Sequence, residues 1–173
     1  ITSGLAAVTK TGGVAFTSAD VGKVAWIAGA GAAGATLVST IASVQSADAC
    51  TLVASASTTV SSAFFGWGTD NTTAIQSAFD NSLEITFPTT PPNLTTPSGN
   101  VYLVQAKAPV YGAGTEYTGG VFPRSGSVLH FLGDATLRAI PTNVGEYVIL
   151  NLTDVEDISI YGGIFQGERD HHI

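Results

Sequence analysis

Apolar and polar residues alternate in short runs along the first 66 residues. Turn-forming residues separate these runs, for example at Thr11-Gly12-Gly13 and at Gly29–Gly34. Short alternating runs bounded by Gly, Ser and Asp are typical of the strands of a small all-β domain. We therefore expect residues 1–66 to form a β-sandwich or β-barrel. Its candidate strands are Val14–Phe16, Val24–Ala28, Leu37–Val44, Thr51–Ala54 and Thr58–Ala63.

Residues 70–82 carry a helical period instead. Ile75, Ala78 and Phe79 recur at i, i+3 and i+4, which places them on one helix face. Asp70 is positioned to cap the first turn by accepting backbone N–H bonds. Because the apolar face is narrow, we expect this helix to cover the end of a larger apolar structure. The Pro-rich residues 83–99 are predicted to be a connector, so the segment 67–99 is a helix followed by a linker.

Strand-like alternation resumes after residue 100. The candidate strands are Val101–Gln105, Gly120–Phe122, Ser127–Leu132, Thr136–Ile140, Tyr147–Leu152, Asp157–Tyr161 and Ile164–Gln166. A shift of 21 residues superposes Leu129 on Leu150, Phe131 on Leu152, Leu137 on Ile158, Ala139 on Ile160 and Val144 on Phe165. Self-similarity at a period near 20 residues is typical of a solenoid.

No helix fits inside this period, which favours a right-handed parallel β-helix over residues 100–173. Stacked coils leave an apolar end and free strand edges unless something covers them. We therefore expect the helix at 70–82 to be the N-terminal cap. The chain stops at Ile173 just after a coil, so we expect the β-helix to be truncated there.

Composition and charge narrow the classes of function. Only 11% of the residues are charged and the net charge is −7. The chain has no basic patch, which excludes a duplex nucleic-acid binder. No apolar run reaches the roughly 18 residues of a membrane span. Cys50 is the single cysteine, so an intrachain disulfide and a cysteine-based zinc cluster are both excluded, and no cofactor is implied.

Four segments resemble motifs of one known group. Gly68–Asp80 looks like the "G-T-D-D-T-x-A-I-Q-x-A" entry of the pectate-lyase-like β-helix superfamily, with Asn71 in place of the second Asp. Val101-Tyr102-Leu103 resembles its "V-Y-L-P" motif, although Val104 replaces the Pro. Ile158–Gly167 is similar to the "I-x-I-x-G-G-x-I-x-G" coil. Phe16–Lys23, with the Gly29–Gly34 loop, resembles the small β-domain that precedes this β-helix in bacteriophage tail spikes and tail fibres.

This resemblance implies a homotrimeric, extracellular virion appendage that binds host surface polysaccharide. Residues 1–66 would then attach to a tail or baseplate protein, and residues 100–173 would begin the β-helix. The alternative is the N-terminal part of a polysaccharide lyase or glycosidase, whose catalytic carboxylates usually lie further along the β-helix than residue 173. A third candidate is a bacterial adhesin with a passive β-helix.

Exposed aromatic residues are the candidate carbohydrate contacts, namely Tyr111, Tyr117 and Tyr161. Trp67 is a further aromatic, but its place just before the helix favours packing beneath that helix. We expect neither a catalytic nor a metal-binding residue in this chain. Glu168–His172 supplies carboxylates and imidazoles, yet adjacent His residues on a strand point to opposite faces. The acids of Asp154–Asp157 are ordinary turn residues.

The segment Gly29–Gly34 also matches G-x-G-x-x-G, and Asp48 follows at about the spacing of a ribose-binding acid. A dinucleotide site requires a helix directly after the glycines. Residues 36–44 are instead rich in Thr, Ser, Val and Ile, which favours a strand. We therefore interpret the glycines as a surface loop between two strands.

Overall fold

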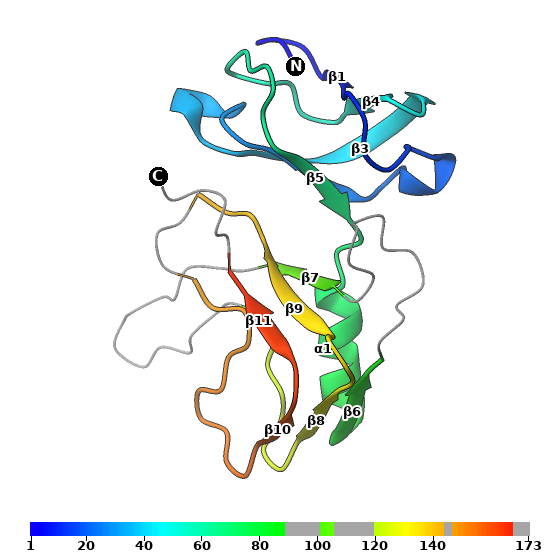
Figure 1. Cartoon of the computed structure of the whole chain (residues 1–173). Helices are drawn as coiled ribbons and strands as arrows, with labels where there is room; N and C mark the ends of the chain where they lie inside the picture. Colours follow the sequence, from blue (N-terminus) through cyan, green and yellow to red (C-terminus); the bar gives the residue numbers. More distant parts are fainter. Residues whose placement is uncertain (89–100, 106–119, 144–146, 168–173) are drawn as a thin grey trace. The chain divides into compact units, whose positions relative to one another are not determined.

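The computed structural model describes residues 1–88, 101–105, 120–143 and 147–167 (Figure 1). These residues form two compact units, one of residues 1–69 and one that begins at Asp70. The described chain is mostly β, with one α-helix. The strands pair antiparallel in the first unit and parallel in the second.

Unit 1 contains one five-stranded antiparallel sheet in the order β1-β4-β3-β2-β5. Its strands are β1 (Ala7–Thr9), β2 (Val24–Ile27), β3 (Leu37–Ser46), β4 (Ala49–Leu52) and β5 (Phe65–Gly68), with short 3-10 helices at Ser18–Asp20 and Ala32–Gly34. β3 pairs with β4 along one part and with β2 along another, and its register with β4 shifts twice. Such irregularities bend a strand and increase its twist. The bend allows β3 to pair with β2 along its first residues and with β4 along its last. The sheet is single, so the predicted sandwich is wrong, and the described pairings do not close it into a barrel.

Two of the predicted strands in unit 1 are absent. Val14–Phe16 forms no strand. The Phe16 side chain instead packs in the core, where its ring centroid lies 5.7 Å from that of Phe65 and 4.7 Å from that of Trp67. Thr58–Ala63 likewise forms no strand, and β5 begins only at Phe65. Trp67 therefore packs in the core of unit 1 rather than beneath the helix.

One glycine of β5 is required by close packing. A Cβ atom on Gly66 would lie 2.4 Å from Cζ2 of Trp26, well inside a van der Waals contact. Gly66 is the cross-strand partner of Trp26. The indole of Trp26 thus lies across β5, and only a residue without a side chain fits beneath it.

Unit 2 contains helix α1 (Thr72–Asn81) and six short strands. They form two parallel three-stranded sheets in the orders β10-β8-β6 and β11-β9-β7, seen in the lower part of Figure 1. The strands are β6 (Glu84–Phe87), β7 (Val101–Gln105), β8 (Val128–Phe131), β9 (Thr136–Ile140), β10 (Ser159–Tyr161) and β11 (Ile164–Gln166). Along the chain, successive strands therefore belong alternately to the two sheets.

The prediction of a connector over residues 83–99 is wrong for its first residues. β6 occupies residues 84–87, where Ile85 and Phe87 are buried and Glu84 and Thr86 are exposed. Two predicted strands, Gly120–Phe122 and Tyr147–Leu152, are reduced to a parallel bridge between Val121 and Leu150. The remainder of the predicted connector lies outside the described residues.

The 21-residue repeat does not describe how the strands stack. Leu129 pairs with Ile160, 31 residues later, and not with Leu150. Leu137 pairs with Phe165 and not with Ile158. Leu150 belongs to a third position, opposite Val121. The 21-residue shift therefore superposed strands that are not neighbours in either sheet. It did so because every strand has the same alternation of apolar and polar residues, so a strand matches any other strand.

The core of unit 2 lies between α1 and the strands. Ile75 and Phe79 of α1 pack on residues of both sheets. Phe79 of α1, Phe87 of β6, Phe131 of β8 and Phe165 of β11 form a row of aromatic contacts that links the helix to both sheets. Phe87 and Phe131 are stacked with centroids 4.2 Å apart and an interplanar angle of 1°. We call these four side chains the phenylalanine row.

Candidate functional site

One face of the β10-β8-β6 sheet gathers polar and aromatic side chains. Successive strand residues point to opposite faces, and Ile85, Phe87, Leu129 and Phe131 occupy the buried one. The opposite face therefore carries Glu84 and Thr86 of β6, Val128 and His130 of β8, and Ser159 and Tyr161 of β10. We call these six residues the polar face. The parallel register sets Thr86, His130 and Tyr161 side by side.

Three side chains of the polar face interact. The rings of His130 and Tyr161 are stacked, with centroids 5.2 Å apart and an interplanar angle of 10°. His130 Nε2 lies 3.5 Å from Oε1 of Glu84. Tyr161 is 57% exposed, so its ring offers an apolar surface beside a carboxylate and an imidazole. This combination suits a sugar, whose C–H faces pack on aromatic rings and whose hydroxyls accept and donate hydrogen bonds.

The sequence identified one member of this face. Tyr161 is one of the three predicted carbohydrate contacts, whereas Tyr111 and Tyr117 lie outside the described residues. His130 and Glu84 were missed. The alternation in Ser127–Leu132 would have placed His130 opposite the buried Leu129, but Glu84 was assigned to the connector.

The Asp70 carboxylate accepts a backbone N–H bond at the start of α1, as predicted. Asp70 itself lies one residue before the N-cap position. Asn71 occupies the N-cap position. The Asp70 carboxylate accepts the backbone N–H of Thr72 at 3.0 Å and the Gln105 side-chain amide at 2.7 Å. Asp70 therefore joins the first turn of α1 to strand β7, which is a structural role.

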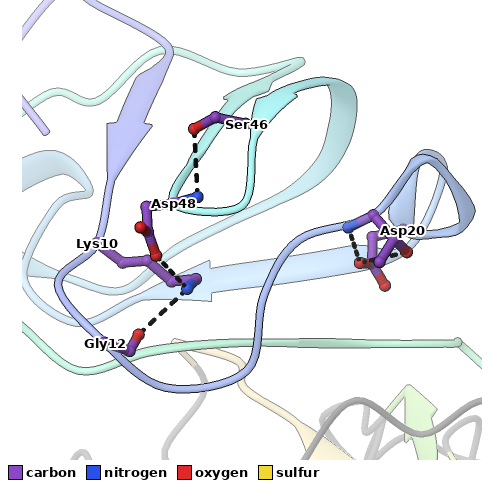
Figure 2. A network of polar contacts seen from close by, with 6 residues as sticks. Lys10, Gly12, Asp20, Ser46 and Asp48 are labelled. Carbon is purple, nitrogen blue, oxygen red and sulfur yellow. Dashed lines mark hydrogen bonds and ion pairs between the residues drawn. The ribbon is translucent and has the colours of Figure 1, made fainter.

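The glycine loop of unit 1 is a strand connection. Gly29–Gly34 lies between β2 and β3, which pair antiparallel, whereas a dinucleotide site needs a helix after the glycines. Asp48 Oδ1 accepts from Lys10 Nζ at 2.9 Å (Figure 2). The same ammonium donates to the Gly12 carbonyl at 3.1 Å. The nucleotide interpretation is therefore excluded for this loop, and the surface-loop interpretation holds.

Three ionisable groups of unit 1 are buried, namely Asp20, Lys23 and Cys50. Asp20 has no exposed surface, and its Oδ1 accepts from Lys23 Nζ at 2.7 Å. Burial raises the pKa of the Cys50 thiol to about 11, and the Asp20 charge adds to this while Lys10 opposes it. A thiol with that pKa is protonated at neutral pH and is a poor nucleophile. Cys50 is thus a packed core residue.

Among the described residues, no three His, Cys, Asp or Glu side chains are grouped closely enough to hold a metal ion. No helix in this part of the chain is long and apolar enough to cross a membrane. The Glu168–His172 segment lies outside the described residues. Comparison with known proteins found no matching family model, no similar curated protein and no similar solved structure.

Proposed function

We propose that this chain is the N-terminal part of a bacteriophage tail spike or tail fibre that binds host polysaccharide. In this proposal unit 2 begins a right-handed parallel β-helix. The observation that carries it is the strand order, in which β6, β8 and β10 build one parallel sheet while β7, β9 and β11 build another. A chain that adds one strand to each sheet per turn winds as a stack of coils, each contacting its neighbours.

Two further features support the start of a coil stack at α1. The Val121–Leu150 bridge adds a third parallel contact between successive turns of the chain. Ile75 and Phe79 of α1 contribute to the same apolar core as the strands, as a capping helix would. The motif at Gly68–Asp80 that resembles the β-helix entry contains this helix.

We assign virion attachment to unit 1. The charged side chains of residues 1–69 are Lys10, Asp20, Lys23 and Asp48, and they form two ion pairs. A surface with almost no unpaired charge avoids the cost of desolvating ions when it is buried against another protein. Such a unit fits attachment to a tail or baseplate protein, with three copies of the chain in one appendage.

We assign host recognition to the polar face. A sugar ring would pack on Tyr161, and Glu84 and His130 would hydrogen-bond its hydroxyls. The stacked His130 ring holds the Tyr161 side chain in place, which reduces the entropy lost on binding. The face is open, as expected for a site that binds a long chain along its length.

An array of bacterial capsular and O-antigen oligosaccharides tests this assignment. We expect the intact chain to bind a subset of these glycans. Tyr161→Ala should weaken binding about two- to tenfold, because an aromatic contact contributes about 0.5–1.5 kcal/mol. Tyr161→Phe should bind like the native chain, because it keeps the ring.

Ile164→Ala is the matched control, since Ile164 is exposed on β11 of the other sheet. It should leave glycan binding unchanged. The absence of any bound glycan, or equal affinity for Tyr161→Ala and the native chain, would contradict the assignment. New reducing ends or unsaturated products in the bound glycan would instead indicate a polysaccharide-degrading enzyme.

A further inference from the structure

The two edge strands of the unit 1 sheet line the same cleft. β1 and β5 stand first and last in the strand order. Val8 and Thr9 of β1 nevertheless share a cleft of about 560 Å³ with Phe65 and Trp67 of β5. The sheet therefore curls enough for both of its edge strands to reach one cleft. Within the described residues no strand pairs with the outer edge of either one.

The outer edge of β1 presents backbone groups to the cleft side. Lys10 N–H donates to Asp48 O, and Leu52 N–H donates to Ala6 O, both at 2.9 Å. Hydrogen-bonded and non-hydrogen-bonded pairs alternate in an antiparallel ladder. Ala7 and Thr9, which lie between the bonded positions, therefore direct their N–H and C=O groups away from β4.

The same alternation applies to β5. Ala28 N–H donates to the carbonyl of Phe64 at 3.1 Å, which makes Phe64 a bonded position. Phe65 and Trp67 are offset from it by one and three residues, so their backbone groups point away from β2. Both strands that line the cleft thus carry backbone donors and acceptors that no strand of the described sheet pairs with.

Most of the remaining lining of the cleft is apolar or electrically neutral. At part of its wall the Val60 N–H donates to the Ile1 carbonyl at 3.1 Å, and the N-terminal ammonium of Ile1 donates to the Val60 carbonyl at 3.2 Å. Val14 and Phe64 line the cleft with 41% and 49% of their surface exposed. The Lys10 ammonium is held by Asp48. The cleft therefore offers apolar contacts, neutral polar groups and backbone hydrogen bonds, and its two cationic groups, Lys10 and the Ile1 ammonium, already have partners in Asp48 and the Val60 carbonyl.

We propose that unit 1 binds an extended, uncharged peptide segment of a partner protein in this cleft. The segment would add a strand between β1 and β5 and complete the curled sheet. Only an extended backbone presents N–H and C=O groups on both of its sides at the spacing of a β-ladder. Strand addition to a free sheet edge is a general mode of peptide recognition. β5 has four residues, so the paired part of the segment should be about as long.

This inference does not depend on what the polar face of unit 2 binds. If unit 1 attaches to a virion protein, the cleft is where a terminal or loop segment of that protein would bind. The two proposals therefore stand on different residues and can fail separately.

A bead-bound library of random ten-residue peptides, screened with the full chain, provides the probe. We expect selected peptides to be poor in charged residues and rich in alternating apolar residues. N-methylation at any of four central residues should weaken binding at least tenfold, because both sides of an inserted strand are hydrogen-bonded. N-methylation near the peptide ends should leave the affinity unchanged.

Thr9→Pro tests the protein side of the same contact. Proline removes the N–H that faces the cleft but no bond of the β1–β4 ladder, and edge strands tolerate proline there. Thr9→Pro should weaken peptide binding at least tenfold, whereas Thr9→Val, which keeps the N–H, should not. If Thr9→Pro fails to fold, the N-methylated peptides still decide the question.

Three results would overturn the proposal. The library could yield no binder above background, or binders that tolerate N-methylation at all central positions. Alternatively, the full chain could form a concentration-dependent dimer that Thr9→Pro dissociates. That last result would assign the cleft to a second copy of the chain.

Discussion

Asp20 is a carboxylate without exposed surface inside unit 1. Burial alone would raise its pKa, but Lys23 Nζ at 2.7 Å and the Thr17 N–H at 2.8 Å hold the charged form. The balance leaves the pKa of Asp20 below its ordinary value. The side chain therefore contributes to folding as an ion, which makes the stability of unit 1 depend on pH.

The pKa of Asp20 is lower in the folded state than in the unfolded chain. The unfolded state thus binds more protons, and stability rises with pH. We expect the contribution of Asp20 to be complete above about pH 4 to 5 and to be lost as pH falls through the lowered folded pKa. Urea denaturation of the native chain between pH 2 and 7 should show this loss.

Asp20→Asn leaves the buried Lys23 ammonium without its carboxylate, which should cost about 3–5 kcal/mol at pH 7. The difference from the native chain should shrink as the pH falls, because protonation removes the same charge. Asp48→Asn is the matched control at a 58% exposed carboxylate, and it should cost about 1 kcal/mol or less at pH 7. A constant difference between Asp20→Asn and native protein across this range would contradict the assignment.

Phe131 and Phe165 share the phenylalanine row but differ in burial. Phe131 is 4% exposed and stacks on Phe87, whereas Phe165 is 46% exposed. Phe131→Ala should destabilise unit 2 by about 3–5 kcal/mol, because it removes a buried ring and leaves a cavity. Phe165→Ala should cost clearly less. Equal losses in urea denaturation would show that the row does not support the core as described.

At the scale of elements, α1 owes its place to contacts outside its own sequence. Its apolar face is narrow, and only Ile75 and Phe79 are buried. An isolated helix of ten residues is marginal in water, so packing against the strands must stabilise it. Asp70 adds a specific link, because its carboxylate holds both the first turn of α1 and Gln105 of β7.

Asp70→Ala should therefore lower the free energy of unfolding by about 1–2 kcal/mol, as for the loss of a cap together with a charged hydrogen bond. Asp80→Ala is the matched control, since Asp80 accepts only an exposed hydrogen bond from Gln76 in the same helix. It should change the stability by about 0.5 kcal/mol or less. Thermal and urea denaturation followed by circular dichroism measure both, and a larger effect of Asp80→Ala would contradict this role of Asp70.

At the scale of the molecule, two different β arrangements follow each other along one chain. Residues 1–69 form an antiparallel sheet, and the described residues from Asp70 onward add strands in parallel. Few side chains are charged, and unit 1 contains two ion pairs. A surface with few unpaired charges can be buried against other copies of the chain at little desolvation cost, as the proposed trimer requires.

Size-exclusion chromatography with light scattering tests that trimer. If the assembly forms through the described residues, the mass in solution should be three times the chain mass of 17.6 kDa. A stable monomer at every concentration tested would contradict the trimer for this chain.

Several strands could be predicted from their own residues. β7, β9 and β11 begin and end where the apolar alternation predicted, at Val101–Gln105, Thr136–Ile140 and Ile164–Gln166. The alternation of β6 was present too, with Ile85 and Phe87 buried, but the prolines that follow it suggested a connector. The polar face was predicted only through Tyr161, because Glu84 and His130, which interact on it, lie on strands distant in sequence from Tyr161.

The sequence by itself determined the β character of the chain, a helix within residues 70–82 and the bounds of several strands. These depend on the period of apolar residues over a few positions, which is a local property. Only the tertiary structure decided that Leu129 stacks on Ile160, that Phe16 leaves its expected strand, and that β1 and β5 border one cleft. Strand register and sheet curvature depend on which distant side chains pack together, and no local period encodes that choice.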